Sequence, residues 1–560
     1  EVTADLSDAV LEEAAKLATE VLSPLNRVGD TVGCKWDDGV VTTPEGFQEA
    51  YSQYVDAGWG AVPFDPEYGG GGFPWVVGVA LQELLTTASM AFSMGPLLTQ
   101  GAIDMLQHHA SDEQKATYLP KMLTGQWTGS MNLTEPQAGS DVGALITKAV
   151  PADDGTYRIS GQKIFITFGE HDLAENIVHL VLARTPDAPP GTKGISCFIV
   201  PKFLLDDDGE PGERNGVTCV SIEHKMGIHA SPTCTLVYED AVGFLIGEAN
   251  EGMRYMFTMM NNARLSVGLE GLALAERSHQ QAVAFARERR QGRAIGGAPG
   301  EQAPIIEHAD VRRMLLTQKA LIEAMRGLMY VNGTAIDLAK HHPDADVRQA
   351  HQEMADLFTP LSKAWGTDMG MEATSLGIQV HGGMGYIEET GAAQHYRDAR
   401  IPPIYEGTNG IQAMDLVGRK LPMRGGGVVA DHLARMQGVA DELAASGDED
   451  LVAIGARLAD GVVAAREGTD WLLEHGLASP NDALAGSTPY LRLLATVTGC
   501  WIVGRQALAA RSGAADQDQR FLDAKVATAR FFADNLLPPA LGQLEAVKVG
   551  AAPLYADCLL

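Results

Sequence analysis

The feature that most constrains the fold is a change of pattern along the chain, from helical to β-rich and back to helical. Near the start, apolar residues from Val10 to Val21 recur at helical spacing. Short β-branched and aromatic runs, bounded by Gly, Pro and Asp, follow within 128–246. Helical spacing returns from Glu251 to about Arg290, and again from Val311 to about Leu338 after a Gly- and Pro-rich loop at 291–304. This order predicts a mainly helical protein with one compact central β domain.

The same changes divide the 560 residues into four predicted domains. Residues 1–127 form a helical N-terminal domain, and residues 128–246 form the central β domain. Residues 247–424 form a second helical domain. The break Gly425–Gly427 then introduces 425–560, an Ala-rich region that is expected to be an additional helical domain. The composition of this last region indicates packing rather than chemistry.

Within the central domain, four runs have the composition of β-strands. The run 157–167 contains Gly161 and is expected to be a hairpin that turns at this glycine. The runs 177–183, 195–200 and 233–238 are expected to be single strands.

The charge balance argues against two classes of partner. Lys and Arg number 42 and Asp and Glu number 72, so the formal net charge is -30. Such an excess repels nucleic acid and anionic membranes, and an anionic substrate would need a local basic patch. The sequence has no run of 18 apolar residues, so no transmembrane helix is expected. The six cysteines are scattered without a CxxC pair, as expected of reduced thiols in a cytoplasmic protein with no metal site.

Two stretches carry polar groups that can bind a flat heterocycle or a phosphate. The loop 131–141 reads Met-Asn-Leu-Thr-Glu-Pro-Gln-Ala-Gly-Ser-Asp. Backbone N–H groups in such a turn can donate hydrogen bonds to a ligand. The stretch 287–293, Arg-Glu-Arg-Arg-Gln-Gly-Arg, is the densest basic cluster of this acidic chain, and guanidinium groups suit pyrophosphate. A structural β-turn and a helix-end charge cluster are the respective alternatives.

Two further stretches combine glycine with candidate functional groups. The stretch 379–385, Gln-Val-His-Gly-Gly-Met-Gly, either allows a ligand to approach the backbone or simply ends a helix. The stretch 405–410, Tyr-Glu-Gly-Thr-Asn-Gly, follows Pro402, which prevents a helix from continuing. A glutamate in a loop is usually solvated. Apolar neighbours would desolvate Glu406, however, and would raise its pKa toward that of a general base.

These four stretches, in this order, resemble the acyl-CoA dehydrogenase family over about Leu6 to Leu421. The resemblance implies a helical N-terminal domain, a β-barrel-like middle domain and a four-helix C-terminal domain. It implies FAD as the cofactor, an acyl-CoA as the substrate and electron-transfer flavoprotein as the electron acceptor. Because the family shares its FAD site across subunits, it also implies at least a homodimer.

The resemblance assigns cofactor contacts to all four stretches and to 165–167. Phe165 stands where the family often has Trp, and Gln291-Gly292-Arg293 replaces the usual Thr-Phe-Gly. The implied FAD contacts are Met131, Leu133, Thr134, Ser140, Phe165, Ile166, Thr167, Arg289, Gln291, Gln379, Gly382, Gly383, Thr408 and Gly410. The implied substrate contacts are Ser140, Asn261, Arg264, Tyr405 and Gly407.

The resemblance identifies Glu406 as the catalytic base. Some family members place the base on a helix at the position of Ala263, and alanine cannot serve there. Glu406 would remove the α-proton of the thioester while the β-hydride passes to flavin N5, giving a trans-2-enoyl-CoA. The rivals are an acyl-CoA oxidase, a flavin monooxygenase, which usually lacks this base, and a catalytically silent flavoprotein subunit.

The additional domain narrows the resemblance to long bacterial members of the family. These include broad-chain enzymes and a group that acts on 3-(methylthio)propanoyl-CoA. The loop Asn132–Gly143 is similar to that of the second group. A short or medium acyl-CoA of this kind is therefore the expected substrate.

Overall fold

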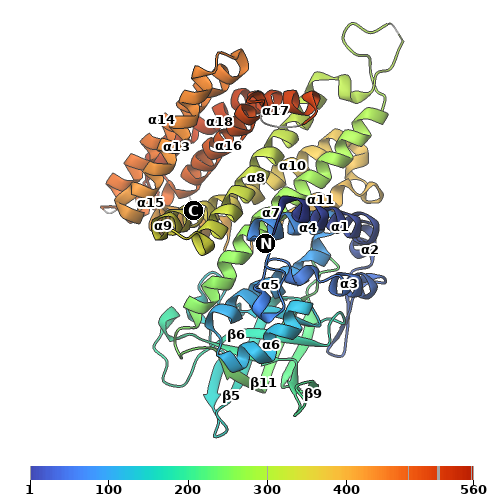
Figure 1. Ribbon diagram of the computed structural model, residues 1–560, viewed down its shortest axis with the longest axis vertical. Coiled ribbons are helices and arrows are strands. Elements are labelled where there is room, and N and C mark those ends of the chain that lie inside the picture. Colours follow the sequence, from blue (N-terminus) through green and yellow to red (C-terminus); the bar gives the residue numbers. More distant parts are fainter. Residues whose placement is uncertain (1, 299, 477, 514–516, 557, 559–560) are drawn as a thin grey trace. The chain divides into compact units, whose positions relative to one another are not determined.

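The computed structural model describes residues 2–298, 300–476, 478–513, 517–556 and 558 (Figure 1). The chain forms two compact units, one ending at Ser266 and the other beginning at Val267. The boundary falls inside one continuous helix, α7 (Gly252–Glu288). The four predicted domain boundaries stay predictions, because this division follows packing and not the changes of sequence pattern.

In its described residues, the first unit begins with six α-helices, of which α6 is capped at both ends. The helix α6 begins with a capping box, in which Ser111 and Gln114 each accept a hydrogen bond from the other's backbone N–H, and it ends at Gly125 with φ +86°. The α-helices are α1 (Ala4–Lys16), α2 (Ser23–Val32), α3 (Phe47–Asp56), α4 (Trp75–Ala88), α5 (Met90–His109) and α6 (Asp112–Thr124). A π-helical turn, Leu17–Leu22, joins α1 to α2.

A seven-stranded sheet follows these helices, as the central β pattern predicted. Its order is β3-β6-β7-β11-β5-β4, and β10 pairs with β11. The strands are β3 (Trp127–Asn132), β4 (Lys148–Pro151), β5 (Tyr157–Thr167), β6 (Asn176–Ala183), β7 (Ser196–Pro201), β10 (Val217–Ile222) and β11 (Thr233–Leu245). The pair β3–β6 is parallel and the other pairs are antiparallel. Two small hairpins are formed by β1 (Lys35–Asp37) with β2 (Val40–Thr42) and by β8 (Phe203–Leu205) with β9 (Pro211–Arg214).

The predicted hairpin at 157–167 is wrong, because this run is the single strand β5. Gly161 does not form a turn; it allows the backbone of β5 to lie close to Thr147. A Cβ at Gly161 would lie 2.5 Å from the Thr147 hydroxyl oxygen and 2.9 Å from its Cα, and the residue has φ +155°. Glycine inside a strand often marks such an approach. The three predicted single strands are confirmed as β6, β7 and the first part of β11.

Helix α5 packs against β3. A Cβ at Gly129 would lie 2.5 Å from the Ala102 Cβ, so only glycine permits this approach. The Thr99 hydroxyl accepts a hydrogen bond from the Gly129 N–H at 3.0 Å. This contact fixes β3, the strand that leads directly into the loop 131–141.

The second unit is helical in its described residues. It comprises the later part of α7, α8 (Ala309–His341), α9 (Ala345–Pro360), α10 (Gly366–His381), α11 (Ala392–Ala399) and α12 (Asn409–Asp415). The predicted helices at 251–290 and 311–338 are confirmed as α7 and α8. Helices α7 and α10 pack closely where each has a glycine. A Cβ at Gly370 would lie 2.6 Å from the Gly271 carbonyl oxygen.

The additional helices belong to this same unit. They are α13 (Gly427–Ala445), α14 (Glu449–Gly476), α15 (Pro480–Ala485), α16 (Ser487–Arg511), α17 (Gln519–Phe531), α18 (Leu537–Leu541) and α19 (Gln543–Lys548). Near the predicted break the chain has positive φ at Arg424, Gly425 and Gly426, and α13 begins at Gly427. Helix α16 packs against α8. A Cβ at Gly327 of α8 would collide with Ile502 of α16. A Cβ at Gly499 of α16 would lie 2.9 Å from the Trp365 ring.

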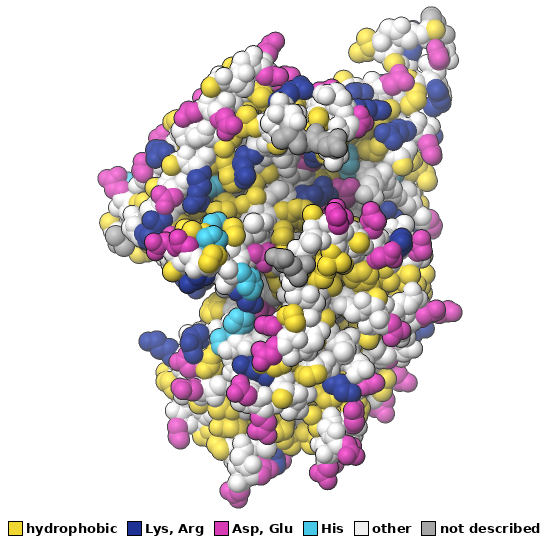
Figure 2. Space-filling view, in the orientation of Figure 1, with side chains coloured by type: hydrophobic (Ala, Val, Ile, Leu, Met, Phe, Trp, Pro, Cys, Tyr) yellow, Lys and Arg dark blue, Asp and Glu magenta, His cyan; other side chains and the backbone are white. Residues whose placement is uncertain are grey.

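One helix of the described residues, α16, is long and apolar enough to cross a membrane by length and composition. Its apolar window is 78% buried within the protein, as in the core helix of a helical domain. The surface view is consistent with the net charge of -30, because acidic side chains are spread widely over this face (Figure 2).

Candidate active site

Two buried charges hold the loop that follows β3. The Lys163 ammonium lies 2.8 Å from the Glu135 carboxylate, and their side chains are 0% and 1% exposed. Lys163 also donates to the Leu133 carbonyl at 2.9 Å, and the Ile164 N–H donates to the Thr134 carbonyl at 2.9 Å. Burial alone would raise the pKa of Glu135, but Lys163 and several hydrogen-bond donors lower it to about 2. The sequence patterns gave no indication of Lys163.

The Glu135 carboxylate also ties this loop to the segment that leads into β4. It accepts hydrogen bonds from the Ile146 N–H at 2.7 Å and from the Thr147 hydroxyl at 2.6 Å. Several donors around one carboxylate make a fully satisfied polar network, which rigidifies the backbone that it joins. The positions of Leu133 and Thr134 therefore depend on Glu135.

A backbone irregularity exposes one predicted flavin contact. The pairing of β5 with β11 shifts between Ile166 and Lys163, and Phe165 lies in this bulge with φ +59°. Such bulges redirect a side chain. Phe165 is 59% exposed, whereas Ile166 is buried. The structure thus presents an aromatic ring at the surface where the sequence predicts a flavin contact.

The hydroxyls predicted to contact the flavin are available for hydrogen bonding. Thr134 and Thr167 are half-buried, and neither hydroxyl bonds to another residue in the described part of the chain. Leu133 is buried, Met131 is half-buried and Ser140 is exposed.

A buried polar cluster under β3 was not found from the sequence. The Ser130 hydroxyl lies 2.7 Å from Nδ1 of His179, and the Asn132 amide donates to Ser130 at 2.9 Å. The Tyr238 hydroxyl donates to the Asn132 oxygen at 3.0 Å. Burial lowers the pKa of His179 to about 3, so the imidazole is neutral at pH 7. The cluster fixes the end of β3 and holds no charge of its own.

A surface groove begins three residues after Ser140. It is lined by Gly143, Ala144, Leu145, Ile146, Lys148, Val150, Arg184, Thr185, Pro186, Ala188, Pro190 and Gly191. Arg184 joins the two loops of the groove, donating to the Gly143 carbonyl at 2.6 Å and the Gly191 carbonyl at 2.7 Å. Among the residues that the structure describes, neither Arg184 nor Lys148 pairs with a carboxylate. The groove is therefore a local basic site on an acidic protein.

The predicted substrate contacts on α7 lie next to each other. The Arg264 guanidinium donates to the Asn261 amide oxygen at 3.3 Å and lies over the Phe257 ring at 5.9 Å. Asn261 is exposed, while Arg264 is only 4% exposed. Arg264 therefore lies within the protein, and its contact with Asn261 connects it to the surface.

In the second unit, Glu406 lies in a tight loop with an unusual backbone. It has φ +54° and is followed by Gly407 with φ +82°. A left-handed conformation is uncommon for glutamate and is found mostly at turns and functional sites. The Glu406 side chain is half-buried. Its neighbour Tyr405 directs its hydroxyl to the buried carboxyl of Glu270 and donates a hydrogen bond to it.

The other end of this loop is held by Asn409, the first residue of α12. Its amide oxygen accepts a hydrogen bond from the buried Lys363 ammonium at 2.9 Å, and its NH₂ group donates to Asp368 at 2.7 Å. The Thr408 hydroxyl caps α12 by accepting from the Ile411 N–H at 3.2 Å. The stretch 405–410 is thus held near both ends by hydrogen bonds to buried residues.

The glycines after α10 leave open space at the surface. The helix ends at His381, as predicted, and Gly382 has φ +60°. A Cβ at Gly382 or Gly383 would meet no atom within 4 Å, and both glycines are exposed, as is Gln379.

The basic cluster after α7 is also at the surface. Arg289 and Gln291 are exposed, and the Arg289 guanidinium donates to the Gln291 side chain at 3.3 Å. The backbone around them is fixed by two hydrogen bonds with the returning chain, from Gln291 N–H to Ala303 and from Ile305 N–H to Arg289.

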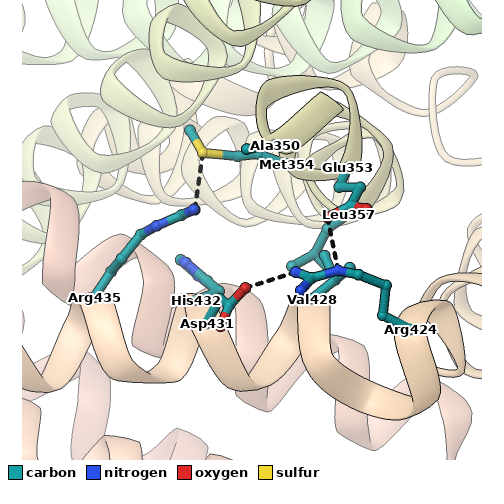
Figure 3. Close-up of a pocket in the computed structure, with 9 residues that line it drawn as sticks. All are labelled: Ala350, Glu353, Met354, Leu357, Arg424, Val428, Asp431, His432 and Arg435. Carbon is teal, nitrogen blue, oxygen red and sulfur yellow. Dashed lines mark hydrogen bonds and ion pairs between the residues drawn. The ribbon is translucent and has the colours of Figure 1, made fainter. Parts of the chain in front are cut away.

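A small pocket between α9 and α13 contains none of the predicted site residues (Figure 3). Arg424 there pairs with Glu353 at 2.9 Å and with Asp431 at 2.6 Å, so its charge is neutralised. Across the described residues, no group of three His, Cys, Asp or Glu side chains could hold a metal ion.

Four family models match consecutive parts of this chain. They are the acyl-CoA dehydrogenase N-terminal domain over 8–126, the middle domain over 130–241, the C-terminal domain over 250–421, and an acetyl-CoA dehydrogenase C-terminal-like model over 432–556. The chain belongs to the acyl-CoA dehydrogenase family, whose members are FAD-binding oxidoreductases that act on CH–CH bonds. The predicted family, fold class and cofactor are confirmed.

Individual proteins are similar over nearly the whole chain. The 3-methylmercaptopropionyl-CoA dehydrogenase of Ruegeria pomeroyi is 50% identical over 96% of this chain and 91% of that protein. A butyryl-CoA dehydrogenase of Syntrophomonas wolfei is 40% identical over 97% of this chain and 91% of its own. The structure of an acyl-CoA dehydrogenase complexed with FAD from Bacillus anthracis shares the fold, with a TM-score of 0.77 and 21% identity over 98% of this chain and 87% of that one.

The residues described above fit FAD. The exposed Phe165 ring and the hydroxyls of Thr134 and Thr167 suit a flat ring with polar edges. The open space at Gly382 and Gly383 would admit a ligand that contacts the backbone.

Proposed function

We propose that this protein removes two hydrogens from an acyl-CoA thioester to give a trans-2-enoyl-CoA, with Glu406 as the base. The observation that carries this proposal is the fixed loop 405–410, which presents a half-buried carboxylate in a strained backbone conformation. Strain at a functional residue persists where its surroundings determine the geometry. Tyr405 and Asn409, each bound to a buried partner, supply those surroundings.

In this reaction Glu406 accepts the α-proton of the substrate. The thioester carbonyl gains negative charge as the proton leaves, and the backbone N–H of Glu406 is suited to donate a hydrogen bond to that oxygen. A base that is already oriented avoids the entropy of finding its position. FAD, when bound, supplies the acceptor for the β-hydride at flavin N5.

Cofactor binding is assigned to two groups of residues. Leu133, Thr134, Phe165 and Thr167 would contact the flavin ring. Exposed groups would contact the diphosphate, ribose or adenine: Arg289, Gln291, Gln379, Gly382, Gly383, Thr408 and Gly410. A homodimer that shares these contacts, a cytoplasmic location and electron-transfer flavoprotein as the electron acceptor complete the proposal.

The proposed substrate is a short acyl-CoA such as 3-(methylthio)propanoyl-CoA. The similarity to a dehydrogenase named for that substrate supports this choice. Coenzyme A carries phosphates, and the basic groove with Lys148 and Arg184 follows Ser140, the predicted contact of the CoA arm. Asn261 and Arg264 would contact the remainder of the substrate.

The test is anaerobic mixing of the FAD-loaded protein with a panel of acyl-CoAs, followed by absorbance of the oxidised flavin. We expect bleaching by 3-(methylthio)propanoyl-CoA and by butanoyl-CoA. Glu406→Gln should retain FAD but bleach at least about 10³-fold more slowly, since it removes the base. Glu389→Gln, an exposed glutamate of the same unit, is the matched control and should bleach normally.

Normal bleaching by Glu406→Gln would refute the assigned base, and no bleaching of the wild type by any acyl-CoA would refute the reaction. Rapid oxygen consumption with peroxide formation would identify an acyl-CoA oxidase instead.

A further inference from the structure

A buried carboxyl on α7 lies directly behind the loop that carries Glu406. Glu270 is 1% exposed, and no sequence motif includes it. Its carboxyl accepts a hydrogen bond from the Tyr405 hydroxyl, although 135 residues separate them in the chain. Burying a carboxyl costs free energy, and an apolar side chain at this position would avoid that cost. Glu270 therefore requires an explanation beyond packing.

The contact holds one end of the catalytic loop, and a second buried charge holds the other. Lys363 is 0% exposed and donates to Asn409, so the loop is fixed three residues after Glu406 as well as one residue before it. Between these two anchors, Glu406 has its left-handed backbone conformation. Loss of either anchor would let the backbone relax and would turn the carboxylate of Glu406 away from its present direction.

We propose that Glu270 is a positioning residue, which holds the Tyr405 phenol and thereby fixes the direction of the Glu406 carboxylate. This inference rests on the proposed function, because it takes Glu406 to be the base. Glu270 acts through Tyr405 and is not itself assigned a contact with the substrate.

The charge state of Glu270 gives this role a recognisable pH dependence. Burial raises the pKa of Glu270 to about 8, and the negative charge of Glu406 acts in the same direction. The hydrogen bond from Tyr405 and the positive charge of Lys363 oppose that rise. Below pH 8 Glu270 is therefore a neutral acceptor. Above pH 8 it gains a negative charge that repels Glu406, so flavin reduction should slow.

The experiment measures the rate of anaerobic flavin reduction by butanoyl-CoA between pH 6.5 and 9.5. Glu270→Leu removes the acceptor and Tyr405→Phe removes the donor. Each should lower the limiting rate by on the order of 10- to 100-fold, because the base is misplaced, and should change the half-saturating substrate concentration less than about 3-fold. Glu270→Gln keeps a neutral hydrogen-bond acceptor. Its flavin should therefore be reduced at the wild-type rate at pH 7, and the rate of flavin reduction should not decline above pH 8.

Glu276→Gln is the matched control on the same helix. Glu276 pairs with Arg326 at 2.8 Å, so its loss perturbs α7 without touching the loop, and its pH profile should follow the wild type. Thermal unfolding without substrate gives a second readout. Since the pKa of Glu270 is raised on folding from 4.5 to about 8, wild-type stability falls across that range. The melting temperature of Glu270→Gln should therefore rise relative to the wild type from pH 4.5 to 8.

Three results would overturn the positioning role: unchanged reduction by both Glu270→Leu and Tyr405→Phe, an equal loss in Glu276→Gln, or a decline above pH 8 that persists in Glu270→Gln. If the wild type itself is not reduced, the proposed function fails, and the inference fails with it. Reduction of the wild type therefore separates the two failures.

Discussion

Replacing Lys163 by methionine would leave the Glu135 carboxylate buried without its counter-ion. Lowering of the Glu135 pKa from 4.5 to about 2 corresponds to about 3 kcal/mol of stabilisation at pH 7. Burial lowers the pKa of Lys163 from 10.5 to about 8, despite the attraction of Glu135, and this costs a similar amount. Both shifts contain the same attraction between Lys163 and Glu135, so they are not summed; a buried ion pair contributes little net stability, while the loss of one partner alone is costly.

We expect Lys163→Met to lose about 3–5 kcal/mol of unfolding free energy at pH 7, the usual cost of breaking a buried ion pair. Glu135→Gln should lose a comparable amount, because it leaves the ammonium buried. The double variant should lose less than about 2 kcal/mol, since no charge then remains. Urea unfolding of the four proteins gives the coupling energy.

Urea unfolding at several pH values tests whether the contribution of Glu135 to the unfolding free energy has the expected direction. The pKa of Glu135 is depressed on folding, so its contribution is present above pH 4.5 and is lost as the pH falls toward 2. A loss of less than about 1 kcal/mol in Lys163→Met, or two single losses that simply add in the double variant, would show that the two charges do not depend on each other.

Two glycine substitutions separate stability from cofactor binding. Gly161→Ala should destabilise the first unit by about 2 kcal/mol or more, because its Cβ meets Thr147, and urea unfolding would show this; a loss below about 0.5 kcal/mol would contradict the close approach. Gly383→Val should leave the melting temperature of the apoprotein within about 2 °C of the wild type, because its Cβ meets no atom within 4 Å, but it should retain less FAD on gel filtration. Full retention of FAD would remove Gly383 from the proposed cofactor site.

The sequence predicted those parts of the fold that depend on neighbouring residues. Long amphipathic helices such as α7 and α8 carry their period over many turns, and β6 and β7 are continuous apolar runs. The hairpin expected at Gly161 is wrong because a glycine in a β run can mark either a turn or a close approach. Only the position of Thr147, on another segment, decides between these two interpretations.

The supporting residues of the site could not be found in this way. Lys163 lies 28 residues from Glu135, and Glu270 lies 135 residues from Tyr405. Neither separation leaves a local pattern, because the folded backbone alone brings the partners together. Glu406 was predicted because it lies within a short motif of the family. The left-handed backbone that holds it in position has no local signal in the residues around it.

The packing of α16 against α8 means that the last 140 residues are not a detachable module. Gly327 and Gly499 have no side chains, so Ile502 packs directly against the first and Trp365 directly against the second. A chain that stopped near Leu421 would expose this apolar seam to water and would tend to aggregate. In this protein the covering surface is part of the same polypeptide, so the face is protected whether or not the chain assembles further.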